Sequence, residues 1–137
     1  MAAEIKVEIE NHIAKLTLNR PSKLNPITYE MWVQLVDILS QIAAMNDVRV
    51  LLISGAGDKA FSVGADIADF EKHRSDVDSA RVYAMAVESS MNAIEAFPKP
   101  TVAMIKGYCM GGGLELAIAC DIRIAASNVS LGIPAAK

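Results

Sequence analysis

The chain has 137 residues, of which 53% are hydrophobic, 21% charged and 5% aromatic. This length fits one domain, and the composition is too apolar for a disordered chain and too interspersed with charge for a membrane span. Thirteen basic and sixteen acidic residues leave a net charge of −3, and no basic run exceeds two residues. We therefore expect no nucleic-acid-binding or membrane-binding surface.

The N-terminal third predicts a hairpin followed by an amphipathic helix. Residues 5–10 and 13–18 alternate apolar and polar side chains, as the half-buried strands of a hairpin do. After a loop over residues 19–26, Thr28 can cap a helix that ends near Asn46. The apolar stripe of this helix consists of Met31, Leu35, Ile38, Leu39 and Ile42.

The rest of the chain predicts alternating strands and helices. Residues 48–54 form a nearly continuous aliphatic run, which is typical of a parallel strand covered on both faces. The order β-β-α-β-α-α-β-α-β predicts an α/β fold. The later expected elements are a short helix entered near residue 67, a longer helix whose apolar face runs from Ala80 to Ile94, strands over 101–108 and 121–126, and an apolar helix over 114–120.

The two cysteines and the N-terminus carry only general information. Cys109 and Cys120 form no C-x-x-C pair and have no histidine near them in the sequence, so we interpret them as buried apolar residues in a reducing compartment. No metal site is expected. The N-terminus lacks a basic region followed by an apolar stretch, so the default expectation is a cytoplasmic location.

Two glycine-bearing loops lead into helices and are candidates for a ligand site. One covers residues 61–66 and the other residues 111–113. Glycine permits close backbone approach to a ligand, and a helix start offers unpaired N–H groups. The spacing fits neither a dinucleotide fingerprint nor a P-loop. One donor from each loop would form an oxyanion hole for a thioester or ester carbonyl; a surface turn and a tight strand-to-helix turn are the alternative interpretations.

Glu115 is the candidate acid or base. It is the only polar side chain between Leu114 and Cys120, on an expected helix with no solvated face. The pattern therefore predicts a buried carboxylate. Such a group is either a general acid/base or one half of a buried salt bridge.

Five motifs, in this order, resemble the enoyl-CoA hydratase/isomerase (crotonase) family. They are Asn19-Arg20-Pro21, residues 61–67, residues 99–103, residues 107–117 and Cys120-Asp121. The resemblance covers essentially the whole chain. It implies a ββα spiral and a crotonase-like acyl-CoA-binding core over residues 1–137, with coenzyme A as part of the substrate and no separate cofactor. It also implies a homotrimer or homohexamer for a full-length protein.

The resemblance further implies roles for individual residues. The backbone N–H groups of Ala65 and Gly112 would form the oxyanion hole for a thioester enolate. Glu115 would be the general acid/base that activates the attacking water. The residues expected to border the substrate and its CoA are Lys23, Asn25, Gly64, Asp66, Ile67 and Gly111.

The sequence departs from the family pattern in two ways. Ala135 stands where hydratases carry a second catalytic glutamate directly after a proline. Hydration normally uses two carboxylates, whereas one base suffices for double-bond isomerisation, so hydratase, isomerase and non-catalytic acyl-CoA-binding homologue all stay open. The chain also stops before the family's C-terminal helices, so we expect an incomplete part of a longer protein. A third hypothesis is an inactive piece whose exposed apolar edge needs the missing part.

Overall fold

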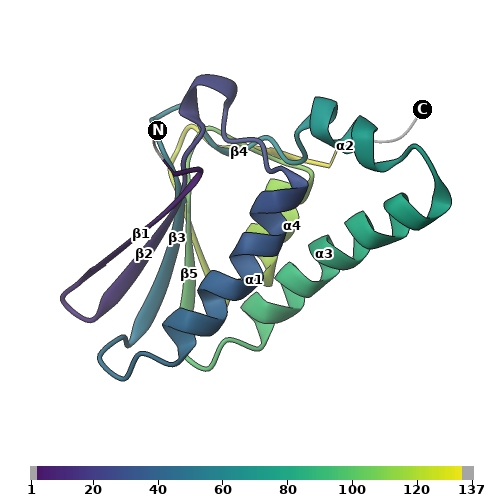
Figure 1. Cartoon of the computed structure of the whole chain (residues 1–137). Coiled ribbons are helices and arrows are strands. Elements are labelled where there is room, and N and C mark those ends of the chain that lie inside the picture. Colours follow the sequence, from purple (N-terminus) through teal and green to yellow (C-terminus); the bar gives the residue numbers. More distant parts are fainter. Residues whose placement is uncertain (1–2, 134–137) are drawn as a thin grey trace.

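The computed structural model describes residues 3–133. Figure 1 shows two sheets with the helices gathered beside the larger one. The elements in chain order are β1 (Ile5–Glu10), β2 (Ile13–Leu18), the 3₁₀ turn η1 (Pro21–Lys23), α1 (Tyr29–Ala43), β3 (Val50–Gly55), β4 (Ala60–Ser62), α2 (Ile67–His73), α3 (Val77–Glu95), β5 (Thr101–Ile105), β6 (Tyr108–Met110), α4 (Gly112–Ala119), β7 (Ile122–Ala125) and β8 (Ser130–Gly132).

The larger sheet has the strand order β1-β2-β3-β5-β7. The first two strands form the expected antiparallel hairpin, and each later neighbour pairs in parallel. A second sheet of three short parallel strands has the order β4-β6-β8. The α/β fold class expected from the sequence is therefore confirmed.

The hydrophobic core lies between the larger sheet and the helices. Leu51, Ile53 and Ala103 point inward and are fully buried, and α1 covers them with the apolar stripe expected from its sequence. The Thr28 hydroxyl caps α1 by accepting a hydrogen bond from the N–H of Met31 at 3.2 Å. The predicted helix and its cap are thus confirmed.

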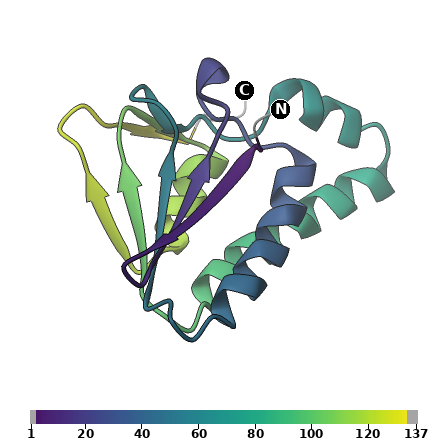
Figure 2. The ribbon, with the colours of Figure 1, turned by 60° about the vertical axis from the view of Figure 1, so that its left-hand side comes forward.

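The expectation that β3 is covered on both faces is wrong for the described residues. Helices α1, α3 and α4 all lie on one side of the larger sheet (Figures 1 and 2). Leu52 on the opposite face is only half-buried, and its neighbours Met104 and Ile124 are exposed. From β2 to β7, each new parallel strand is added on the same side of the previous one. Because the connections between parallel strands are right-handed, adding strands in one direction places every connecting helix on the same face of the sheet.

The structure also divides the strand expected over residues 101–108. Gly107 separates β5 from β6, so the two halves belong to different sheets. Gly107 has a φ of +56°, and a Cβ at this position would collide with the carbonyl of Lys59. Glycine is therefore required where the chain crosses from one sheet to the other.

Within residues 3–133, no helix combines the length and the apolarity that a membrane crossing requires.

Candidate active site

The two glycine-bearing loops lie against one another. A Cβ placed on Gly64 would lie 3.1 Å from the amide nitrogen of Gly112, and a Cβ placed on Gly112 would lie 3.9 Å from the amide nitrogen of Ala65. The backbone amides that the sequence singled out are thus neighbours in space. One belongs to the loop before α2 and the other to the first residue of α4.

The pairing of this loop with Ile27 orients the Ala65 amide. The N–H of Ile27 donates to the carbonyl of Gly64 at 2.8 Å, and the N–H of Asp66 donates to the carbonyl of Ile27 at 2.9 Å. In parallel pairing of this kind, the N–H of the middle residue points away from the partner segment. Ala65 is that middle residue, so its N–H faces away from Ile27.

The N–H groups of Ala65 and Gly112 are both free to donate. Gly112 is the first residue of α4, where an N–H has no intrahelical acceptor. Neither its N–H nor that of Ala65 has a hydrogen-bond acceptor among residues 3–133. Two adjacent, unpaired amide donors are the arrangement that binds a carbonyl oxygen whose negative charge increases during a reaction.

The other two glycines of the triple-glycine turn serve the backbone. Gly111 has a φ of +52°, which permits the sharp entry into α4. A Cβ on Gly113 would lie 2.6 Å from the carbonyl oxygen of Ser62 in β4. The absence of a side chain therefore lets α4 pack directly on β4, which holds the Gly112 amide in place.

Glu115 occupies the first turn of α4, three residues after Gly112, but its side chain is exposed. The expected burial is wrong, as is the expected fully enclosed helix, because Ile118 on the same helix is 57% exposed. Nor does Glu115 form a salt bridge with any residue in the range 3–133. An apolar sequence indicates that a helix has no polar face; it does not indicate that neighbouring elements cover every face.

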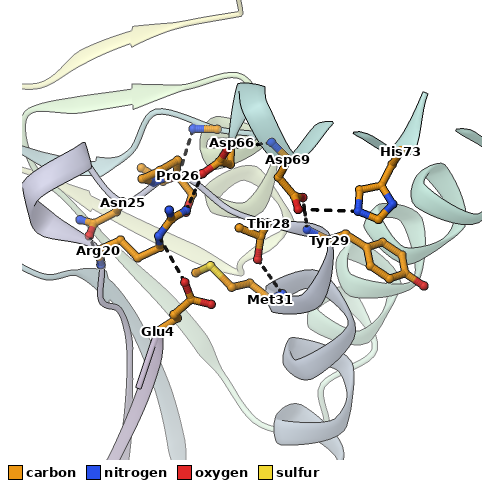
Figure 3. Close-up of polar contacts among 12 residues, drawn as sticks. Glu4, Arg20, Asn25, Pro26, Thr28, Tyr29, Met31, Asp66, Asp69 and His73 are labelled. Carbon is orange, nitrogen blue, oxygen red and sulfur yellow. Dashed lines mark hydrogen bonds and ion pairs between the residues drawn. The ribbon is translucent and has the colours of Figure 1, made fainter. Parts of the chain in front are cut away.

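Asp66 joins the Ala65 loop to the rest of the structure (Figure 3). One carboxylate oxygen caps α2 by accepting from the N–H of Asp69 at 3.0 Å, and the other accepts from Arg20 at 2.9 Å. The pKa of Asp66 lies below its usual value. The hydrogen bond from the Asp69 N–H is the largest cause, and the hydrogen bond from Arg20 is the second. Arg20 also contacts Glu4 and the carbonyl of Pro26. The Asp66 side chain is thus already used within the fold.

The remaining predicted substrate contacts differ in how accessible they are. Asn25 is fully buried, and its side chain accepts from the Arg20 N–H and donates to the carbonyls of Ala56 and Ala60. Its backbone N–H also donates, to the carbonyl of Arg20 at 2.9 Å, so Asn25 offers a ligand no exposed group. Lys23 and Ile67 are exposed.

These segments nevertheless converge on the amide pair. The N–H of Val63 donates to the carbonyl of Leu24 at 3.1 Å, so the segment over residues 23–25 runs beside the Ala65 loop. Gly64 and Gly111 flank the two amides directly. The structure thus brings the predicted site segments to one place.

Sequence reasoning missed four side chains around this site. Arg20 and Asp69 tie α2 to the loops, the latter by accepting from the N–H of Tyr29 at 2.7 Å. Trp32 packs its ring against Gly112, and the hydroxyl of Tyr83 from α3 lies near that ring. None of these contacts has a local sequence signal, because each joins residues that are far apart in the chain.

Both cysteines are buried, as expected, and burial raises the pKa of each thiol to about 11. Among residues 3–133, no group of three or more histidine, cysteine or acidic side chains could hold a metal ion.

Comparisons with known proteins agree with this geometry. The chain matches the enoyl-CoA hydratase/isomerase family over residues 8–137. It is 41% identical over 133 residues to a crotonyl-CoA hydratase of Syntrophomonas wolfei, covering 95% of this chain and 49% of that protein. It is 35% identical over 133 residues to an (E)-benzylidenesuccinyl-CoA hydratase of Thauera aromatica, covering 97% and 51%.

A solved structure shows the same fold. The crystal structure of an enoyl-CoA hydratase/carnithine racemase from Magnetospirillum magneticum superposes with a TM-score of 0.92 at 38% identity, over 98% of this chain and 50% of that one. The chain thus spans about half the length of the relatives it matches. With the family's sequence pattern present over nearly every residue and its fold confirmed, the chain belongs to the enoyl-CoA hydratase/isomerase family.

Proposed function

We propose that this chain forms the oxyanion hole of an enzyme that acts on acyl-CoA thioesters by hydratase or isomerase chemistry. The thioester oxygen would accept hydrogen bonds from the amides of Ala65 and Gly112 while the acyl group passes through an enolate. The observation that carries this proposal is the adjacency of the two unpaired amides. Removing one donor of such a pair typically costs about 2.7–4 kcal/mol of transition-state stabilisation.

Glu115 is proposed as the general acid/base. In hydration it would take a proton from water as the oxygen adds to C3 and the C2–C3 π electrons move toward the thioester oxygen. The resulting Glu115 carboxylic acid would then protonate C2 as the enolate collapses, which restores the carboxylate. In isomerisation it would remove a proton from C2 and return one to C4, which shifts the double bond. Its position one helical turn from Gly112, with an exposed side chain, leaves the carboxylate accessible to a substrate.

The other parts of the proposal concern binding and assembly. The substrate and its CoA would run along Lys23, Gly64, Asp66, Ile67 and Gly111. The buried Asn25 would act indirectly, by holding the segment that carries Lys23 through its side-chain hydrogen bonds. Coenzyme A would enter as part of the substrate, with no separate cofactor. Assembly into a homotrimer or homohexamer and a cytoplasmic location stay predictions.

One feature of the sequence favours a second candidate, a non-catalytic acyl-CoA-binding homologue. Ala135 stands where the resemblance places a second glutamate, and this position lies outside the described residues. An alanine cannot transfer a proton. This candidate keeps the amide pair and the binding role but predicts no turnover.

Turnover of two thioesters tests the proposal. The native protein, expressed from its complete reading frame, is assayed with crotonyl-CoA for hydration and with a 3-enoyl-CoA for isomerisation. Glu115→Gln should lower the active reaction by about 10²- to 10⁴-fold, whereas Glu95→Gln, an exposed glutamate at the end of α3, should leave it unchanged. Equal rates in wild type and Glu115→Gln would refute the role of Glu115. Tight CoA-ester binding by calorimetry without any product would establish the non-catalytic candidate instead.

A further inference from the structure

Arg20 lies directly before η1, and its charged side chain is mostly buried beside the Ala65 loop. The Nη1 nitrogen donates to two acceptors, the carboxylate of Asp66 at 2.9 Å and the carbonyl of Pro26 at 3.1 Å (Figure 3). The Nε nitrogen lies 3.4 Å from the carboxylate of Glu4. The donors of a guanidinium lie in one fixed plane, so these three acceptors together hold the Arg20 side chain in one orientation.

The bond to Pro26 begins a chain of hydrogen-bonded peptide groups. The Pro26 carbonyl and the Ile27 N–H belong to one peptide group, and the Gly64 carbonyl and the Ala65 N–H belong to another. In a planar trans peptide group the C=O and the N–H point in opposite directions. The Ile27 N–H donates to the Gly64 carbonyl at 2.8 Å. The chain therefore runs from Arg20 through two peptide groups to the N–H of Ala65.

This chain determines the direction of the Ala65 N–H. Each hydrogen bond restricts the rotation of the next peptide group, and hydrogen-bonded groups in series polarise one another. A further bond, from the N–H of Asp66 to the carbonyl of Ile27 at 2.9 Å, holds the other side of Ala65. Because the carboxylates of Asp66 and Glu4 balance the charge of Arg20, Arg20 contributes orientation rather than net charge.

We propose that Arg20 is a positioning residue, which orients the Ala65 amide toward the thioester oxygen through these two peptide groups. The Gly112 amide is held independently, by the packing of α4 on β4. Loss of Arg20 should therefore weaken one donor of the pair and leave the other in place. This inference rests on the proposed function, because it assumes that the thioester oxygen binds at the two amides.

The carbonyl stretching band of a bound thioester reports hydrogen bonds to its oxygen. Such bonds weaken the C=O bond and lower its stretching frequency. Butyryl-CoA has no double bond to hydrate, so a sample isotopically labelled at the thioester carbon gives this band by infrared spectroscopy on the native protein without hydration. Wild type should lower the frequency relative to the free ester. Arg20→Lys keeps the charge but lacks the planar fork, and should return the frequency part of the way.

Affinity and turnover give two further measurements on the same variant. The affinity of Arg20→Lys for butyryl-CoA, measured by calorimetry, should change by less than about twofold, because Arg20 itself contacts no part of the ester. On a thioester that wild type turns over, kcat should fall by about tenfold, which is less than the roughly 10²- to 10³-fold cost of losing a whole donor.

Three other variants complete the design. Glu4→Gln alters the third partner of the guanidinium but leaves both Nη1 bonds, so the band should match wild type. Asp121→Asn weakens a contact away from the loop, with the N–H of Thr101 at the start of β5, and should also leave the band unchanged. Asp66→Asn loosens the guanidinium on its other side and should shift the band in the same direction as Arg20→Lys. It replaces Arg20→Lys if that variant does not fold.

The outcomes separate this inference from the function on which it rests. An unchanged band in Arg20→Lys overturns the inference, even when stability or affinity falls, because that result reports only a structural role. An equal band shift in Asp121→Asn overturns it as well, because general loosening of the fold then accounts for the shift. If wild type does not bind the ester, or binds it without lowering the carbonyl frequency, the proposed function itself fails.

Discussion

The contact between Arg20 and Asp66 should contribute measurably to stability, and the structure allows its size to be worked out. The pair joins two loops that are 46 positions apart, and each side chain is 15% exposed. In Asp66→Asn the side chain can still cap α2, since asparagine is as good a cap as aspartate. What is lost is the charge on the acceptor of the Arg20 bond.

The expected loss is about 1–2 kcal/mol at neutral pH. A hydrogen bond to a charged group is worth about 1.5–3 kcal/mol. Arg20 keeps two other partners, the carboxylate of Glu4 at 3.4 Å and the carbonyl of Pro26 at 3.1 Å, so its charge is not left unpaired. These contacts place the effect toward the low end of the range.

The effect of pH has a definite sign. Folding lowers the pKa of Asp66 below its unfolded value of about 3.9. Stabilisation by the carboxylate is therefore complete above that unfolded pKa and is lost as the pH falls through the lower folded pKa. The difference between wild type and Asp66→Asn should stay constant between about pH 6 and 8 and shrink below about pH 4.

Urea unfolding followed by circular dichroism at a series of pH values provides the assay. The matched control is Asp76→Asn. Asp76 caps α3 by accepting from the N–H of Ser79 at 2.7 Å and forms no salt bridge with any of residues 3–133. At neutral pH the control should lose clearly less stability than Asp66→Asn. Equal losses in the two variants would show that the Arg20 contact contributes nothing beyond capping.

The packing of α4 and the burial of the thiols give two further predictions. Gly113→Ala should destabilise the protein by about 1–3 kcal/mol, because its Cβ would lie 2.6 Å from the Ser62 carbonyl; thermal unfolding would measure this loss, and an unchanged melting temperature would contradict the close packing. Cys109 and Cys120 should not react with a thiol reagent at pH 8 until the protein is denatured, because burial raises the pKa of each thiol to about 11. Rapid labelling of the folded protein would refute their burial.

The sequence predicted the features that depend on neighbouring residues. The hairpin, the Thr28 cap and the stripe of α1 come from local patterns, and each is found in the structure. The expected half-buried alternation holds for β2 but is wrong for β1, where only Ile5 is buried. The short strands β4 and β8 were missed because three residues are too few to show a period. The division at Gly107 was missed because an aliphatic run looks the same whether its strand continues in one sheet or passes into another.

Burial on a particular face was the least predictable property. The β3 run was interpreted as covered on both faces and the α4 helix as enclosed. Leu52 in β3 is only half-buried, with Met104 of β5 exposed beside it, and Ile118 in α4 is exposed. An apolar side chain shows that a position tolerates burial. Which element covers that side chain depends on the strand order and on the direction of the crossovers. An aliphatic stretch of sequence contains no information on either.

At the site too, features set by neighbouring residues could be predicted, whereas contacts between distant residues could not. Glycine requirements are local, because a positive φ or a close backbone approach restricts a position to one residue type, so the glycines indicated the two loops. The family resemblance then implied the amides of Ala65 and Gly112. The groups around the pair, Trp32 and Tyr83, come from different helices and have no spacing that links them. The positions of the two loops could therefore be predicted from the sequence, whereas the side chains packed around the amide pair become visible only when the helices are assembled.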